Sequence, residues 1–81
     1  MNKTFFKNQK DMSAKLIEII DLYWEGKVNE FDFFNNINTL VDNNIDIIFK
    51  DDNYRAVITQ RLGKKRICLL NKVLNFRNEA K

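Results

Sequence analysis

The chain has 81 residues, of which 44% are apolar and 31% charged, a composition that predicts a folded globular protein. Histidine is absent, which excludes the commonest general base, the commonest zinc ligand and every nucleophile pair that needs histidine. One cysteine excludes an internal disulfide and a cysteine-rich zinc site. We therefore expect a single domain over residues 1–81 that is not an enzyme and uses no metal or cofactor.

The net charge of +3 is distributed unevenly along the chain. Residues 1–52 hold six lysines against ten carboxylates, a balance of −4. Residues 53–81 hold eight Lys and Arg residues against Glu79 alone, a balance of +7. This asymmetry favours a polyanion or an acidic protein as the partner of the basic end.

The hydrophobic segments are too short for a membrane protein. The longest apolar run, Ile67 to Leu70, has four residues, whereas a membrane-spanning helix needs about twenty. The first ten residues, MNKTFFKNQK, contain only Phe5 and Phe6 where a signal peptide needs an apolar run of about 7 to 15 residues. We expect a cytoplasmic protein with no membrane partner.

The first predicted helix runs from Met12 to Glu25. Asp11 or Ser13 is expected to cap its start, and Gly26 is expected to stop it. The apolar residues that recur at helical spacing and predict its buried side are Met12, Leu16, Ile19, Ile20 and Tyr23.

A second helix is predicted after Asn29, which stands where an N-cap is needed. The connection is short, about Gly26 to Val28, so the two helices should form an antiparallel hairpin. Trp24 and the phenylalanines are expected to fill the core, although an exposed Trp24 would be a candidate interface anchor. The predicted buried side of the second helix comprises Phe33, Phe34, Ile37, Leu40 and Val41.

The stretch from Asn44 to Phe49 fits a single helical turn or a short strand equally well. No partner strand is evident, which favours the short helix. The polar residues Asp51, Asp52 and Asn53 are then expected to form the cap of the next helix.

The spacing of Asp42, Asn44 and Asp46 resembles the start of an EF-hand calcium loop. Ile47 and Asn53 replace the glycine and glutamate of that loop, so no metal site is predicted.

Two further helices are predicted on either side of Gly63, which should end the first of them. The first would bury Tyr54, Val57, Ile58 and Leu62. The second, from about Lys64 to Arg77, would bury Ile67, Leu70, Val73 and Leu74, with Leu69 and Phe76 at the sides. The predicted fold is therefore all-α, a compact bundle of four to five short helices whose C-terminal pair crosses at Gly63.

Residues 58–74, ITQRLGKKRICLLNKVL, resemble the helix-turn-helix of bacterial regulators, in which a glycine separates a supporting helix from a recognition helix. Ile58, Leu62 and Leu69 occupy apolar positions of that pattern. Lys64 and Lys72 depart from it, because they stand where apolar residues are usual, and Thr59 replaces a small residue. The resemblance implies a second helix that reads a DNA groove.

Cys68 has apolar neighbours in sequence, which predicts a small core residue. The polar face of the last helix nevertheless includes it. Lysines on that face suit phosphates, and asparagines can pair with adenine. The cluster from Lys64 to Arg66 adds positive charge at a helix N-terminus, which already attracts anions. The predicted contact residues are Arg61, Lys64, Lys65, Arg66, Asn71, Lys72 and Asn75.

Three explanations of this basic surface remain open. It contacts nucleic acid, it docks on an acidic protein, or it is a solvated surface that pairs with the acidic first helix. The leading expectation is a small DNA- or RNA-binding or regulatory module, which would gain affinity as a homodimer. The rival is a protein-interaction module.

The motifs DLYWEGK and RLGKKR, the latter followed by I-LL-KVL, resemble small uncharacterised helical proteins of clostridia and other low-GC Gram-positive bacteria. The abundance of Asn, Lys and Ile is typical of an AT-rich genome. Small basic proteins of such genomes are often carried by phages and mobile elements. By analogy, the rival module would be an inhibitor of a host or defence protein, or an immunity protein.

Overall fold

The computed structural model describes the backbone of residues 6–79 and the side chains of residues 6–75. Its first helix, α1, comprises Gln9–Trp24 and begins three residues earlier than predicted. The reason is that Asn8, and neither Asp11 nor Ser13, is the N-cap, because the Asn8 Oδ1 atom accepts from the Asp11 N–H at 2.8 Å. Ser13 is buried, and its hydroxyl donates to the Gln9 carbonyl.

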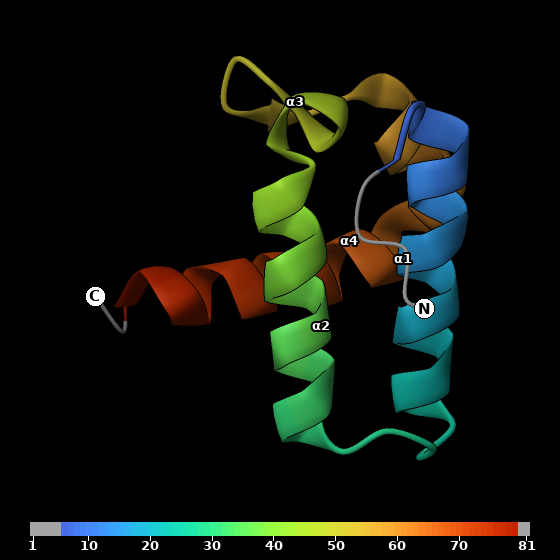
Figure 1. Ribbon diagram of the computed structural model, residues 1–81, viewed down its shortest axis with the longest axis vertical. Helices are drawn as coiled ribbons and strands as arrows, with labels where there is room; N and C mark the ends of the chain where they lie inside the picture. The colour runs from blue at the N-terminus through green and yellow to red at the C-terminus, as the bar shows by residue number, and fades with distance from the viewer. Residues whose placement is uncertain (1–5, 80–81) are drawn as a thin grey trace.

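The second helix, α2, comprises Glu30–Asn43 and confirms Asn29 as its N-cap, with an Asp32 N–H to Asn29 Oδ1 distance of 2.8 Å. Gly26 has φ of 76°, the left-handed conformation expected of a residue that ends a helix. The short connection turns the chain back, so α1 and α2 are antiparallel neighbours (Figure 1). The predicted hairpin is confirmed.

A helical turn and a small β-hairpin, in which each strand has two residues, follow α2. The turn, α3, comprises Ile45–Ile48 and confirms a short helix within the stretch from Asn44 to Phe49, although Phe49 itself belongs to a strand. Strands β1, Phe49–Lys50, and β2, Asn53–Tyr54, pair antiparallel, with Phe49 opposite Tyr54. The prediction missed this hairpin.

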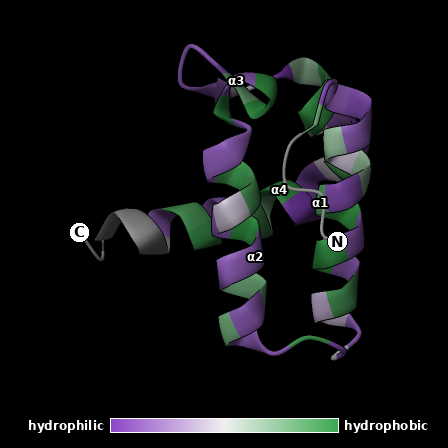
Figure 2. Ribbon diagram, viewed as in Figure 1, coloured by the Kyte–Doolittle hydropathy of each residue, from purple (hydrophilic) through white to green (hydrophobic). Residues whose placement is uncertain are grey.

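The expected cap made by Asp51, Asp52 and Asn53 is wrong. Asp51 and Asp52 form the two-residue turn between the strands, with φ of 51° and 71°. This turn is hydrophilic and projects from the body of the molecule (Figure 2). Because Tyr54 belongs to β2, the next helix begins only after Arg55, whose carbonyl accepts from the Thr59 N–H.

The last helix, α4, comprises Ala56–Glu79 and contains both predicted C-terminal helices. They are separated by a kink at Gly63, where φ is 82° and ψ is 167°. This backbone conformation is essentially restricted to glycine, which explains the residue at this position. Beyond the kink, α4 runs across the α1–α2 hairpin (Figure 1).

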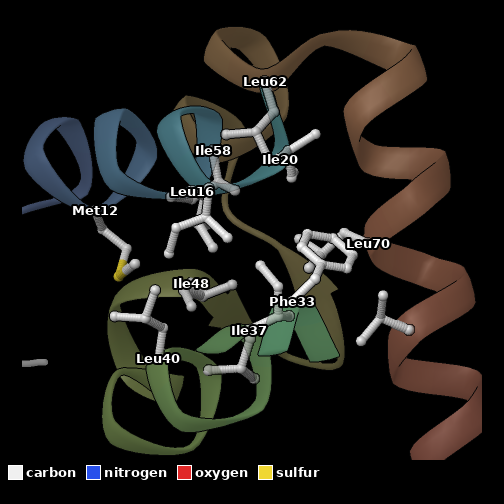
Figure 3. Packing of buried hydrophobic residues seen from close by; sticks show 13 residues of the cluster. Met12, Leu16, Ile20, Phe33, Ile37, Leu40, Ile48, Ile58, Leu62 and Leu70 are labelled. Atoms are coloured by element: carbon white, nitrogen blue, oxygen red, sulfur yellow. The ribbon is translucent and has the colours of Figure 1, made fainter. Parts of the chain in front are cut away.

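All four helices contribute to one hydrophobic core (Figure 3). The ring of Phe33 is fully buried and stacks on Tyr23, with centroids 4.1 Å apart. Complete burial of an aliphatic or aromatic side chain stabilises the fold by about 1.5–3 kcal/mol, so these residues dominate stability. The buried apolar residues are Met12, Leu16, Ile19, Ile20, Phe33, Ile37, Leu40, Val41, Ile48, Ile58, Leu62, Leu70 and Val73.

The chain thus has the predicted all-α fold, with four helices and one small β-hairpin in the described part. The expectation that Trp24 and all phenylalanines fill the core is wrong, since Trp24 is 49% and Phe31 73% exposed. Each lies about 100° or 200° around its helix from a packed aromatic neighbour, Tyr23 or Phe33. The side chain of Phe76 lies outside the described residues. None of the described helices combines the length and apolar character that a bilayer-spanning segment requires.

Candidate functional site

The exposed side of α4 beyond Gly63 carries most of the predicted contact residues. Its buried side is formed by Leu70 and Val73, with Ile67, Leu69 and Leu74 partly buried at the borders. At 100° per residue, the opposite side is a single polar surface. We call this surface the α4 face, and its exposed residues are Lys64, Lys65, Cys68, Asn71, Lys72 and Asn75.

The α4 face contains no carboxylate, because the sequence from Asn53 to Asn78 has no acidic residue. Among the described side chains, no carboxylate forms an ion pair with Lys64, Lys65 or Lys72. The three ammonium groups therefore point to solvent without internal neutralisation, and they raise the local potential for anions.

Cys68 lies in the middle of the α4 face and is exposed. The prediction of a core cysteine is wrong, although its sequence neighbours Ile67 and Leu69 are apolar. The reason is angular, since Cys68 lies about 160° around the helix from buried Leu70. Its thiol is a natural reporter of anything that covers this surface.

Arg66 points inward and does not belong to the α4 face. Its Nε atom donates to Asp21 Oδ1 and its NH2 group to Asp21 Oδ2, both at 3.1 Å. Its NH1 group donates to the Leu62 carbonyl at 3.1 Å, just before the kink. The guanidinium carbon also lies 5.8 Å from the centre of the Trp24 ring. Of the basic cluster, Arg66 thus pairs with the acidic first helix, one of the three explanations left open by the sequence, and this pairing removes it from the candidate contact residues.

Asn71 is exposed but already has a partner. Its Oδ1 atom accepts a 2.6 Å hydrogen bond from the Tyr54 hydroxyl, which ties β2 to α4. Burial raises the pKa of Tyr54 to about 12, so the phenol keeps the proton that it donates. Recognition of adenine through both amide atoms of Asn71 would have to use the second lone pair of Oδ1 or replace this bond. Asn75 is exposed.

Arg61 lies on the other side of the kink and lines a different part of the surface. There it borders an open depression of about 640 Å³ between the start of α1, α3 and the start of α4. We call it the basic depression. Its charged residues are Lys7, Lys10, Asp46, Arg55 and Arg61.

The sequence pattern gave no sign of the basic depression, because Lys7 and Lys10 belong to the half of the chain with a balance of −4. They join Arg55 and Arg61 only through folding.

Asp42, Asn44 and Asp46, whose spacing resembles a calcium loop, do not form a calcium site in this structure. Asn44 is buried, its Nδ2 group donates to the Leu40 carbonyl at 2.7 Å, and its Oδ1 atom accepts from the Phe6 N–H at 3.0 Å. In the described part of the chain, no three residues with metal-binding side chains gather.

The kink also differs from a helix-turn-helix. Only Gly63 departs from helical backbone angles between the two segments of α4. A helix-turn-helix places a turn of three to four residues there. The lysines at positions 64 and 72, which depart from the apolar pattern of that motif, are both exposed here.

A family model described as "Conserved hypothetical protein" matches residues 3–75, which include the hairpin, the basic depression and all of the α4 face. The chain belongs to this family. The family of conserved hypothetical proteins has a clostridial name, which agrees with the resemblance seen in the sequence. No curated protein and no solved structure matches the chain.

Proposed function

We propose that the protein binds nucleic acid through the α4 face, with its lysines on backbone phosphates. The supporting observation is the exposed, carboxylate-free array of Lys64, Lys65 and Lys72 on one side of a helix that the core holds in place. Lys64 and Lys65 lie one helical turn from Cys68, and Lys72 lies one turn further on. This spacing allows successive phosphates of one strand to be contacted.

The contacts in this proposal are mainly electrostatic. Lysine is a flexible point charge that suits phosphate, whereas sequence is read by side chains that contact base edges. Asn75 is available for such a contact, and Asn71 is held by Tyr54. We therefore propose binding with modest sequence preference. One copy presents a small surface, so a homodimer of this cytoplasmic protein would be the effective form.

Titration with mixed-sequence DNA duplex, single-stranded DNA and RNA at two salt concentrations tests the proposal. The double variant K65E/K72E should weaken binding at least about tenfold at low salt and reduce the slope of log K against log salt by about 2. Both residues are exposed, so the fold should persist, which circular dichroism checks.

The matched control is K27E/K50E, which changes the net charge equally at exposed lysines outside the α4 face. It should retain affinity within about threefold. Bound nucleic acid should also slow alkylation of Cys68. The absence of binding at low salt, or equal losses in both double variants, would refute the proposed interface.

The second candidate function is a protein-interaction module, such as a phage or mobile-element inhibitor or an immunity protein. The exposed aromatic rings of Trp24 and Phe31, which flank the α1–α2 connection, favour it. An apolar interface at this end would respond little to salt, and W24A/F31A would disrupt it without changing nucleic-acid affinity. Sedimentation of the wild type and this variant would show whether the partner is a second copy.

A further inference from the structure

We propose that the basic depression is a separate binding site for a compact polyphosphate of the kind that a nucleoside triphosphate carries. Four cationic residues from different parts of the chain, Lys7, Lys10, Arg55 and Arg61, line it together with one carboxylate, Asp46. The formal balance of these residues is +3. None of the lysines of the α4 face lines the depression, so the two sites share no residue.

One of the four cations is held in place by the fold. Arg55 is half-buried, and its Nε atom donates to the Asp46 carbonyl at 2.8 Å. Its backbone N–H donates to the Ile48 carbonyl, also at 2.8 Å. The planar guanidinium has five N–H donors, and Nε uses only one. A fixed, weakly hydrated guanidinium is well suited to phosphate oxygens, because less freedom is lost on binding.

The first turn of α1 supplements the charged side chains. Gln9 and Lys10 line the depression, and the Asn8 cap satisfies the Asp11 N–H. The backbone N–H groups at the very start of a 16-residue helix have no partner within the helix, and the helix dipole is positive at this end. Asp11 is exposed nearby and accepts a 3.3 Å bond from the neutral Asn8 amide group, so its carboxylate keeps its charge and opposes part of the attraction.

The arrangement favours a compact anion over an extended strand. The cations come from the segment before α1, from α1 itself, from Arg55 just before α4 and from Arg61 near the end of the first segment of α4, and they surround one hollow. Charges of one sign around a concave surface concentrate the field at its centre. A triphosphate carries three to four negative charges close together and matches the balance of +3. Ile47 and Val57, both partly buried, provide an apolar side against which the rest of such a ligand would lie.

Calorimetric titration with inorganic tripolyphosphate, followed by a nucleoside triphosphate, tests this site. Saturable binding of one tripolyphosphate per chain is expected. The variant K10Q/R61Q, both exposed, should weaken it at least about tenfold, because it removes two charge-assisted contacts. D46N should strengthen it severalfold, since it removes the opposing charge and leaves the backbone carbonyl that holds Arg55.

The control K65Q/K72Q removes the same charge from the α4 face and should leave the tripolyphosphate affinity within about twofold. In heteronuclear NMR spectra, the Gln9, Lys10 and Val57 amide signals should shift on titration. A lack of saturable binding, equal losses in both double variants, or a D46N variant that binds no more tightly would overturn the site. A further outcome would also overturn the polyphosphate site: the wild type binds no tripolyphosphate, and K10Q/R61Q loses nucleic-acid binding. The depression would then be part of the nucleic-acid surface. The proposal that the α4 face binds nucleic acid is tested separately, with the variant K65E/K72E and with nucleic acid as the ligand.

Discussion

The α1–α2 hairpin and the region from Asn44 to Gly63 are stabilised in different ways. Both hairpin helices begin with the same local device, an Asn whose side chain accepts from the N–H of an Asp three residues later, at 2.8 Å. The Asn amide groups also donate to the two Asp carboxylates, at 3.3 and 3.2 Å. A glycine with positive φ ends the first helix. Each of these interactions spans only a few residues.

The region from Asn44 to Gly63, in contrast, depends on partners that are distant in sequence. Asn44 bonds to Phe6, 38 residues away, and Tyr54 bonds to Asn71, 17 residues away. The cross-strand rings of Phe49 and Tyr54 stack with centroids 5.1 Å apart. Two strands of two residues have little stability on their own, so these contacts must hold the hairpin in position. The difference shows that the same residue type, asparagine, acts as a local cap at Asn8 and Asn29 and as a long-range tie at Asn44.

The largest effect should come from Asn44→Ala. The substitution removes a buried amide that bonds to the Leu40 carbonyl and the Phe6 N–H. Since these two buried or partly buried hydrogen bonds are then lost, we expect a loss of about 2–3 kcal/mol in the free energy of unfolding. Urea denaturation measures this loss, and hydrogen exchange of the Phe6 amide should accelerate.

The control for Asn44 is Asn36→Ala, at an exposed position of α2, the helix that Asn44 caps. It should change stability by less than about 0.5 kcal/mol. If the two substitutions cost the same, Asn44 is an ordinary helix-end residue and the contrast between the two regions fails at this point.

A smaller effect is expected from a glycine comparison, Gly63→Ala against Gly26→Ala. A Cβ atom would meet nothing within 4 Å at either position, so only backbone conformation distinguishes them. Gly26 occupies a helix-ending conformation, whereas ψ of 167° places Gly63 in a region that is essentially closed to other residues. We expect Gly63→Ala to cost about 2 kcal/mol and Gly26→Ala about 1 kcal/mol in thermal or urea unfolding.

The outcome also tests the kink itself. Alanine favours a helix over glycine by about 1 kcal/mol, so an α4 that can straighten would be stabilised by Gly63→Ala. A stabilised variant would show that the core does not require the bend. A variant that is destabilised but still binds nucleic acid through the α4 face would show that the kink serves core packing and is not needed for binding.

The parts of the fold that could be predicted from sequence are those that depend on local interactions, as in the hairpin. Helical spacing of apolar residues placed the two hairpin helices and located the kink at Gly63, because these features depend on residues close in sequence. The β-hairpin was missed because two-residue strands leave no alternating pattern. The turn residues Asp51 and Asp52 were assigned to a cap, since Asp serves both purposes and only the positive φ values distinguish them.

The candidate site was predictable to the extent that one helix carries it. Lys64, Lys65, Lys72 and Asn75 lie on one exposed face, as helical geometry requires. Whether a cation is accessible depends on the neighbouring element, so sequence could not separate Arg66, which pairs with Asp21, from the lysines beside it. The grouping of Lys7, Lys10, Arg55 and Arg61 depends wholly on tertiary structure, and no local pattern indicates it.

The smallest effect is a pH dependence that isolates the tie between Tyr54 and Asn71. Burial raises the Tyr54 pKa from 10.0 to about 12, so the unfolded chain loses this proton at lower pH than the folded protein does. The stabilisation is therefore complete below about pH 10 and is lost as the pH rises towards 12. The full shift corresponds to about 2.7 kcal/mol, but the ring is only partly buried, so we expect about 1 kcal/mol.

Urea unfolding of the wild type and of Tyr54→Phe between pH 8 and 12 measures this contribution. Phenylalanine does not titrate, and lysine titration is common to both proteins. The difference in stability between the two proteins should shift in favour of phenylalanine above pH 10. A difference that stays constant over this range would mean that the Tyr54 hydroxyl is as exposed in the folded protein as in the unfolded chain, and that β2 is not tied to α4.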